Sequence, residues 1–74
     1  MEVYKNLGGN SAVMSYESGY DWILVEFFDG SVYRYSYASA GQKHVEQMKR
    51  LAAAGRGLNT YINQAGAAYD SKTG

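Results

Sequence analysis

Residues 22–37 read WILVEFFDGSVYRYSY and contain the strongest strand and turn signals in the chain. Aromatic and β-branched residues dominate both halves of this stretch, as they do in β-strands. Asp29-Gly30 between the halves is a typical hairpin turn. The sequence therefore predicts two antiparallel strands, over residues 22–28 and 31–37. Strict alternation places the tyrosines of the second strand on one face: Tyr33, Tyr35 and Tyr37.

The hairpin has two alternative registers, because a slip of one residue moves every side chain to the other face. A two-residue turn would place the three tyrosines beside Trp22, Leu24 and Phe28. A three-residue loop, with Gly30 as a left-handed bulge, would place them beside Ile23, Val25 and Phe27. We predict the bulged register, because Glu26 and Arg34 then share one face and the other face carries no charge.

Weaker patterns on either side of the hairpin complete the predicted fold. Loose alternation over residues 12–17, followed by a turn at 18–21, predicts a third strand. Ser39 is a candidate N-cap, with Gln42 three residues later as in a capping box. The buried stripe of that helix is expected to be Val45, Met48, Leu51 and Ala52. Gly55 is placed to end it.

A second, short helix is predicted from four apolar residues at helical spacing, ending at Gly66: Leu58, Tyr61, Ile62 and Ala65. The fold class is therefore α+β, with a three-stranded antiparallel sheet packed on one main helix plus a short C-terminal helix. Residues 1–74 form one domain. Residues 1–10 are either an edge strand or an arm that reaches a partner, and residues 67–74 are a flexible tail in which Tyr69 is the one candidate anchor.

The composition limits how the domain is stabilised and what it binds. The chain has 74 residues, no cysteine and one histidine, so disulfides and thiolate metal sites are excluded and a homo-oligomer is expected. Seven basic and seven acidic side chains cancel, which argues against a large nucleic-acid footprint but allows one small phosphorylated ligand. Without a long apolar run or a signal-peptide core, we expect no membrane contact and a cytoplasmic location.

The side chains needed for catalysis are missing from the sequence. The one histidine, His44, is predicted on the solvated face of the main helix, away from any nucleophile. The carboxylates follow no spacing that brings a pair together, and Asp21 and Asp29 are typical turn residues. There is no metal or cofactor signature. We therefore predict a protein that is not an enzyme and holds no cofactor.

Several short segments occur in the order seen in one known family. They are Ser11-Ala12-Val13, Gly19-Tyr20-Asp21, the strand residues Ile23, Val25 and Phe27, then Gly30, Tyr33-Arg34-Tyr35, Gly55-Arg56-Gly57-Leu58-Asn59 and Ile62. This set resembles the KTSC domain, a small module at the C-terminus of some lysyl-tRNA synthetases and in free-standing bacterial and phage proteins. The resemblance covers roughly residues 10–63 and implies the α+β fold. It also suggests RNA binding, by association with the synthetase.

Two segments are candidate ligand contacts. Arg34, on a sheet face beside Trp22 or Phe28, is suited to a phosphate, and the alternative is a cross-strand pair with Glu17 or Glu26. Gly55-Arg56-Gly57 precedes a helix, so backbone amides and the arginine are suited to an anion. The alternative is a plain connector between helices.

These residues predict a non-enzymatic nucleotide-binding module, in which aromatic side chains stack on bases and cations hold phosphates. The predicted site residues are Trp22, Tyr33, Arg34, Tyr35, Arg56, Asn59 and Tyr61. For a phage protein, we expect sequestration of a small cyclic nucleotide immune signal in the host cytoplasm. The alternatives are an RNA-binding accessory domain and a protein–protein interaction module with the tyrosine-rich face as its interface.

Overall fold

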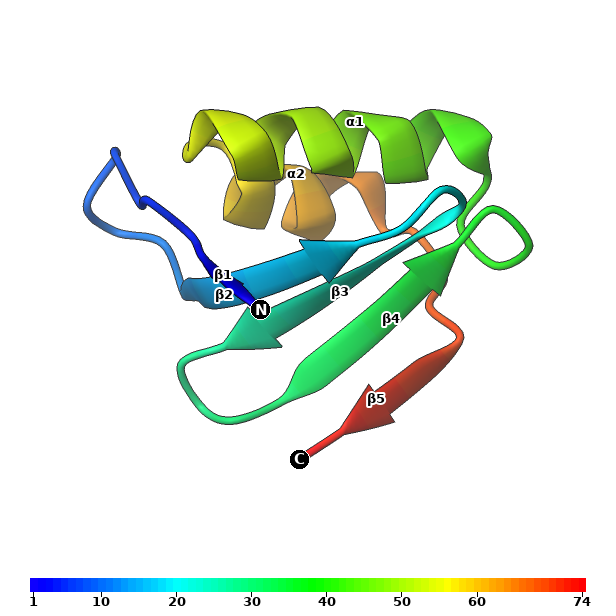
Figure 1. Ribbon diagram of the computed structural model, residues 1–74, viewed down its shortest axis with the longest axis horizontal. Coiled ribbons are helices and arrows are strands. Elements are labelled where there is room, and N and C mark those ends of the chain that lie inside the picture. The colour runs from blue at the N-terminus through cyan, green and yellow to red at the C-terminus, as the bar shows by residue number, and fades with distance from the viewer.

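One antiparallel sheet and two helices on one of its faces make up the structure (Figure 1). The computed structural model describes residues 1–74. The sheet has five strands in sequence order, and the elements are β1 (Glu2–Val3), β2 (Val13–Ser18), β3 (Trp22–Phe27), β4 (Val32–Ser36), α1 (Gln42–Ala54), α2 (Leu58–Ala65) and β5 (Ser71–Thr73). The predicted α+β class is confirmed, but the sheet has five strands rather than the predicted three. Neither helix has the length and apolar character that a membrane span requires.

The central hairpin adopts the bulged register. Ile23 pairs with Tyr35 and Val25 pairs with Tyr33, as predicted for a three-residue loop. Gly30 has a φ of 91°, a left-handed value that L-residues rarely adopt. The amide of Gly30 donates to the carbonyl of Phe27, and the amide of Phe27 donates to the carbonyl of Ser31. The loop thus fixes which face of each strand meets the helices.

The two additional strands are short and lie at the sheet edges. β1 comes from the N-terminal segment and pairs with β2, so the edge-strand alternative for residues 1–10 is the one observed. β5 lies in the segment predicted as a flexible tail and pairs with β4, where Lys72 faces Tyr33. The amide of Asp70 donates to the carbonyl of Arg34 at 2.7 Å and starts this pairing. Backbone hydrogen bonds, rather than apolar alternation, hold both edges.

The main helix begins later than predicted. Gly41 is its N-cap residue, and Ser39 does not cap it. Ser39 instead belongs to the turn after β4, where its hydroxyl accepts a hydrogen bond from the amide of Ser36 at 3.0 Å. The C-terminal end of α1 is as predicted, because Gly55 is left-handed and its amide donates to the carbonyls of Leu51 and Ala52. α2 ends at Gly66 in the same conformation.

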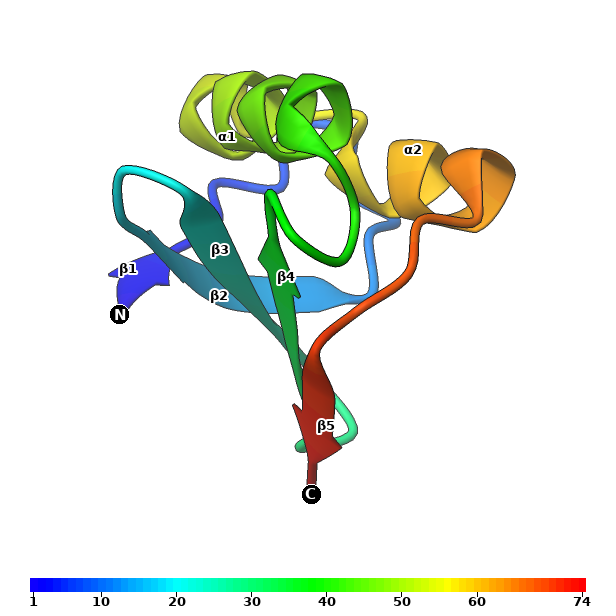
Figure 2. The same ribbon diagram turned by 90° about the vertical axis from the view of Figure 1, so that its right-hand side faces the viewer.

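The core lies between the sheet and the helices, which share one side of the sheet in both views (Figures 1 and 2). Nine buried residues form it: Tyr4, Val13, Ile23, Val25, Tyr35, Val45, Met48, Ala52 and Leu58. Leu51, predicted in the buried stripe, is half-buried at its margin. Tyr4 joins this core from the N-terminal segment. The core is small, as expected for a chain of this length.

Tyr4 also has a polar role, because its hydroxyl accepts a hydrogen bond from the amide of Leu58 at 3.3 Å. α2 has no side-chain cap at its N-terminus, so the Tyr4 hydroxyl provides a hydrogen-bond acceptor for one of the amides in the first turn. We expect Tyr4→Phe to lower the free energy of unfolding by about 0.5–1.5 kcal/mol. Urea unfolding followed by circular dichroism measures this, with Tyr16→Phe as the control since its hydroxyl bonds only to the exposed Glu2. Equal midpoints for Tyr4→Phe and wild type would contradict the role.

Candidate functional site

A hollow with four aromatic side chains among its nine lining residues lies between the β3–β4 hairpin and α2. We call it the aromatic hollow, and its lining residues are Ala12, Phe27, Phe28, Asp29, Ser31, Tyr33, Tyr35, Ile62 and Asn63. Its volume is about 500 Å³, within the range of small-molecule sites in proteins. The hollow is therefore large enough for a flat organic ligand.

The rings of this hollow support one another. Phe27 meets Tyr33 edge to face, with centroids 5.5 Å apart, and Tyr33 lies nearly parallel to Tyr35 at 6.4 Å. Tyr69, from the segment after α2, packs edge-on against Tyr33 at 4.9 Å, so it anchors the C-terminal segment as the sequence suggested. The ammonium of Lys72 lies 5.6 Å from the Tyr33 ring centroid. Such mutual contacts hold the rings in place and so favour a preformed ligand surface.

Tyr35 places a polar group in this apolar surface. Only 3% of the residue is exposed, and burial, with smaller contributions from Tyr33 and Tyr69, raises its pKa to about 12. The hydroxyl therefore remains protonated at neutral pH. This hydroxyl has no hydrogen-bond partner within the protein. Every fully buried side-chain polar atom of the structure does have a partner, so the Tyr35 hydroxyl is not fully buried. The hydroxyl thus retains access to the hollow and is free to donate to a ligand.

Asp29 adds a carboxylate at the same hollow. One of its oxygens, Oδ1, accepts hydrogen bonds from the hydroxyl of Ser31 at 2.6 Å and from the amide of Ser31 at 2.9 Å. These bonds lower the pKa of the carboxyl group, so the charged form is retained near neutral pH. The second oxygen, Oδ2, has no partner in the protein and is free to accept from a ligand.

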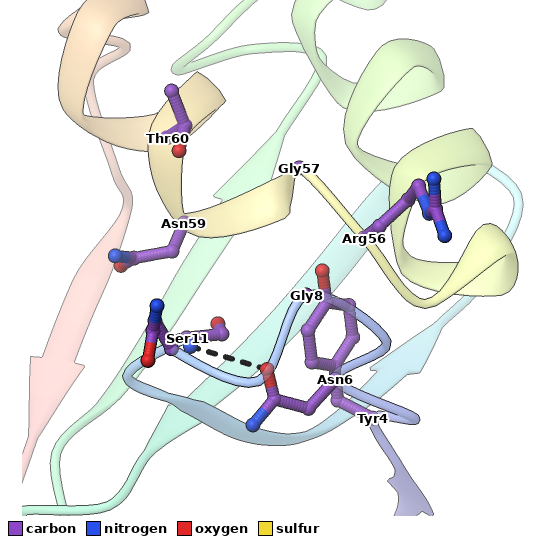
Figure 3. A pocket seen from close by; sticks show the side chains of 9 residues that line it. Tyr4, Asn6, Gly8, Ser11, Arg56, Gly57, Asn59 and Thr60 are labelled. Atoms are coloured by element: carbon purple, nitrogen blue, oxygen red, sulfur yellow. Dashed lines mark hydrogen bonds between the residues drawn. The ribbon is translucent and has the colours of Figure 1, made fainter.

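A second, polar hollow lies where α2 begins (Figure 3). It has a volume of about 150 Å³ and is lined by Tyr4, Asn6, Gly8, Asn10, Ser11, Arg56, Gly57, Asn59 and Thr60. In Figure 3, Tyr4 and Asn6 of the N-terminal segment lie across from Gly57 and Asn59. Asn6 accepts a hydrogen bond from the amide of Ser11 at 3.1 Å, which fixes the loop. This volume suits a small group such as a phosphate rather than a whole nucleotide.

Several donors at the polar hollow have no acceptor in the protein. Arg56 is a lining residue whose exposed side chain extends away from Asn6 and Asn59 in Figure 3, and it makes neither an ion pair nor a hydrogen bond. The backbone amides of Asn59 and Thr60 belong to the first turn of α2, which lacks a side-chain cap, and no bond satisfies them. Helix dipole and unsatisfied amides both favour an anion here.

The two hollows are neighbours. Ser11 lines the polar hollow and the next residue, Ala12, lines the aromatic hollow. Asn59 and Asn63 likewise contact one hollow each, and they lie four residues apart on the same face of α2. Side chains at this spacing are about 5–6 Å apart. The two hollows therefore adjoin along α2.

The structure divides the seven predicted site residues into separate groups. Tyr33 and Tyr35 line the aromatic hollow, whereas Arg56 and Asn59 line the polar hollow. Trp22 and Arg34 are on the opposite face of the sheet, away from the helices, because they alternate with the core-facing residues. Tyr61 lies between the helices.

Arg34 and Tyr61 each have a partner within the fold. The Arg34 guanidinium forms an ion pair with Asp70 and lies 5.8 Å from the centroid of the Trp22 ring. Its partner is therefore neither Glu17 nor Glu26, and the pair helps to hold the segment before β5. The Tyr61 hydroxyl is 2.6 Å from Nδ1 of His44, which is half-buried rather than fully solvated.

That the protein is not an enzyme stays a prediction.

Most residues that line the two hollows were not among the predicted site residues. The prediction did not include Phe27 and Phe28 in the site, although their position next to the Asp29-Gly30 turn marks one end of the sheet. Asn6 and Ser11 were beyond its reach, because only the folded chain brings the N-terminal segment to α2. Asn63 could have been found from its spacing, since it stands one helical turn after Asn59.

Comparisons of this chain with protein-family models, with curated proteins and with solved structures found no match. The resemblance to the KTSC domain therefore stays a hypothesis.

Proposed function

We propose that this protein is a non-enzymatic nucleotide-binding module that holds a base in the aromatic hollow and a phosphate in the polar hollow. One observation carries the proposal: a ring-lined hollow with an unpartnered tyrosine hydroxyl adjoins a polar hollow with unpaired cationic and amide donors. A nucleotide has the matching two ends, one flat and aromatic and one anionic.

The aromatic hollow suits a base because stacking requires only a flat π-surface. Phe27, Phe28 and Tyr33 supply aromatic surface at its wall, and Ile62 supplies an apolar contact from α2. Stacking of a base on an aromatic side chain contributes about 1–3 kcal/mol. The ligand would also cover part of Phe28, which is one of the large exposed apolar side chains.

The polar hollow suits a phosphate because its free donors are cationic or aligned with a helix dipole. Arg56 can form two parallel hydrogen bonds to phosphate oxygens. The amides of Asn59 and Thr60 add donors whose positions are already fixed by α2. Gly57 has a φ of 82°, which lets the backbone turn sharply into the helix at this point.

The formal charge of zero favours one small nucleotide over a long RNA. In a phage, such a module would act in the host cytoplasm as a homo-oligomer and sequester a small cyclic nucleotide used as an immune signal. An RNA-binding accessory domain and a protein interaction module are the competing functions.

Calorimetric titration tests the proposal. We expect saturable binding of a mononucleotide or a cyclic dinucleotide, and weaker binding of the corresponding nucleoside, because the nucleoside leaves the polar hollow empty. A short RNA is titrated at two salt concentrations. Binding of RNA alone, with a steep loss of affinity at higher salt, would favour the accessory domain. Absence of binding by every nucleotide and RNA would favour the protein interaction module.

A further inference from the structure

We infer that the aromatic hollow selects a guanine base, through the free carboxylate oxygen of Asp29. This inference rests on the proposed function, because it assumes that the hollow holds a base. It follows from which polar groups line the hollow and which of them lack a partner.

Asp29 presents an acceptor that is held in place. Its Oδ1 is occupied by the two hydrogen bonds from Ser31, which leaves Oδ2 without a partner on a residue that lines the hollow. A carboxylate accepts hydrogen bonds and repels other acceptors. It therefore favours a base whose edge carries adjacent donors. Guanine has such an edge, with a ring N–H beside an exocyclic amino group.

The remaining free groups in the hollow complement the other side of guanine. The Tyr35 hydroxyl has no partner, and neither does the side-chain amide of Asn63. Both can donate to the carbonyl oxygen or the ring nitrogen acceptors that guanine also carries. Guanine can thus pair with the Asp29 acceptor and with the Tyr35 and Asn63 donors in one hollow. In largely apolar ligand sites, a few such polar groups fix the orientation of the ligand.

The same carboxylate disfavours adenine and orients the nucleotide. The edge of adenine places a ring nitrogen acceptor beside its single amino group, and that acceptor would face the charge of Asp29. Phosphate is repelled from Asp29 as well, although Lys72 lies near enough to offset part of this charge. The anionic end is therefore directed to the hollow that Arg56 borders.

Titration with three mononucleotides that differ only in the base tests the inference. GMP is expected to bind about ten- to a hundred-fold more tightly than AMP, since charge-assisted hydrogen bonds differ between them. IMP, which lacks only the exocyclic amino group of GMP, is expected to be intermediate. This comparison uses the unmodified protein, so it does not depend on the folding of a variant.

Asp29→Asn then tests the residue itself. The asparagine keeps an oxygen to accept from Ser31, so the hairpin turn is retained, but it removes the negative charge. We expect this variant to lose most of the preference for GMP over AMP. Glu17→Gln is the matched control, because it removes one exposed carboxylate that has no hydrogen bond or ion pair, and it should keep the full preference.

The outcomes separate this inference from the function on which it rests. Equal binding of GMP and AMP by the unmodified protein, or tighter binding of AMP, overturns guanine selection and leaves the nucleotide-binding function standing. An unchanged GMP preference in Asp29→Asn overturns the role of the carboxylate. Failure of all nucleotides to bind overturns the proposed function itself.

Discussion

Ile23→Ala is expected to lower the free energy of unfolding by about 2–5 kcal/mol. Ile23 is fully buried on β3, pairs with Tyr35 and is among the largest side chains that solvent cannot reach. Its truncation removes apolar burial and leaves a cavity that the surrounding sheet and helix can close only in part. Domains have on the order of 0.05–0.15 kcal/mol of stability per residue, so one such change removes much of the total.

The measurement is urea unfolding followed by circular dichroism, with a control on the same strand. Leu24→Ala removes a side chain of the same size from the open face of β3, where it is half-buried opposite Arg34. It should shift the unfolding midpoint much less than Ile23→Ala. Equal shifts for the two variants would mean that the assignment of the two sheet faces is wrong.

Arg56→Ala is expected to weaken nucleotide binding by roughly ten- to a hundred-fold, because it removes the one arginine at the polar hollow. The free energy of unfolding should hardly change, since the exposed guanidinium has no partner within the protein. Calorimetric titration of the nucleotide that wild type binds best gives the affinity. A thermal melt gives the stability.

Arg50→Ala is the matched control for this variant. Arg50 is an exposed arginine of α1 that bonds only to Gln47, so its removal changes the net charge equally and leaves the polar hollow intact. We expect its affinity to match wild type. Equal losses in the two variants would point to a general effect of charge, and an unchanged affinity in Arg56→Ala would remove Arg56 from the site.

Local signals in the sequence were sufficient for the centre of the fold. Side chains alternate between the two sheet faces along residues 22–37, and Gly30 can adopt the left-handed backbone conformation of a bulge. Together these two features select one hairpin register, which the structure confirms. Gly55 and Gly66 end the helices for the same conformational reason. The start of α1 was misplaced because Ser39 had two available roles, and its hydroxyl bonds to the turn after β4 instead of capping the helix.

The edge strands and the grouping of the site depended on contacts that no local pattern carries. β5 is polar and only three residues long, so its pairing with β4 follows from tertiary hydrogen bonds. Tyr33 and Tyr35 were predicted at a ligand surface because of their alternation, and both line a hollow. The same alternation places Arg34 on the other face, so a site joining all three was inconsistent with the predicted register. Arg34 instead pairs with Asp70.

The two short edge strands also have a consequence for the behaviour of the protein at high concentration. The aromatic strands β3 and β4 are the segments most able to pair with other chains, and β1, β2 and β5 flank them. A polar edge with a lysine is a poor template for intermolecular β-pairing. Loss of residues 70–74 would leave the outer backbone edge of Val32-Tyr33-Arg34 without its β5 partner. A truncated chain would therefore be prone to aggregate even where its core remained folded.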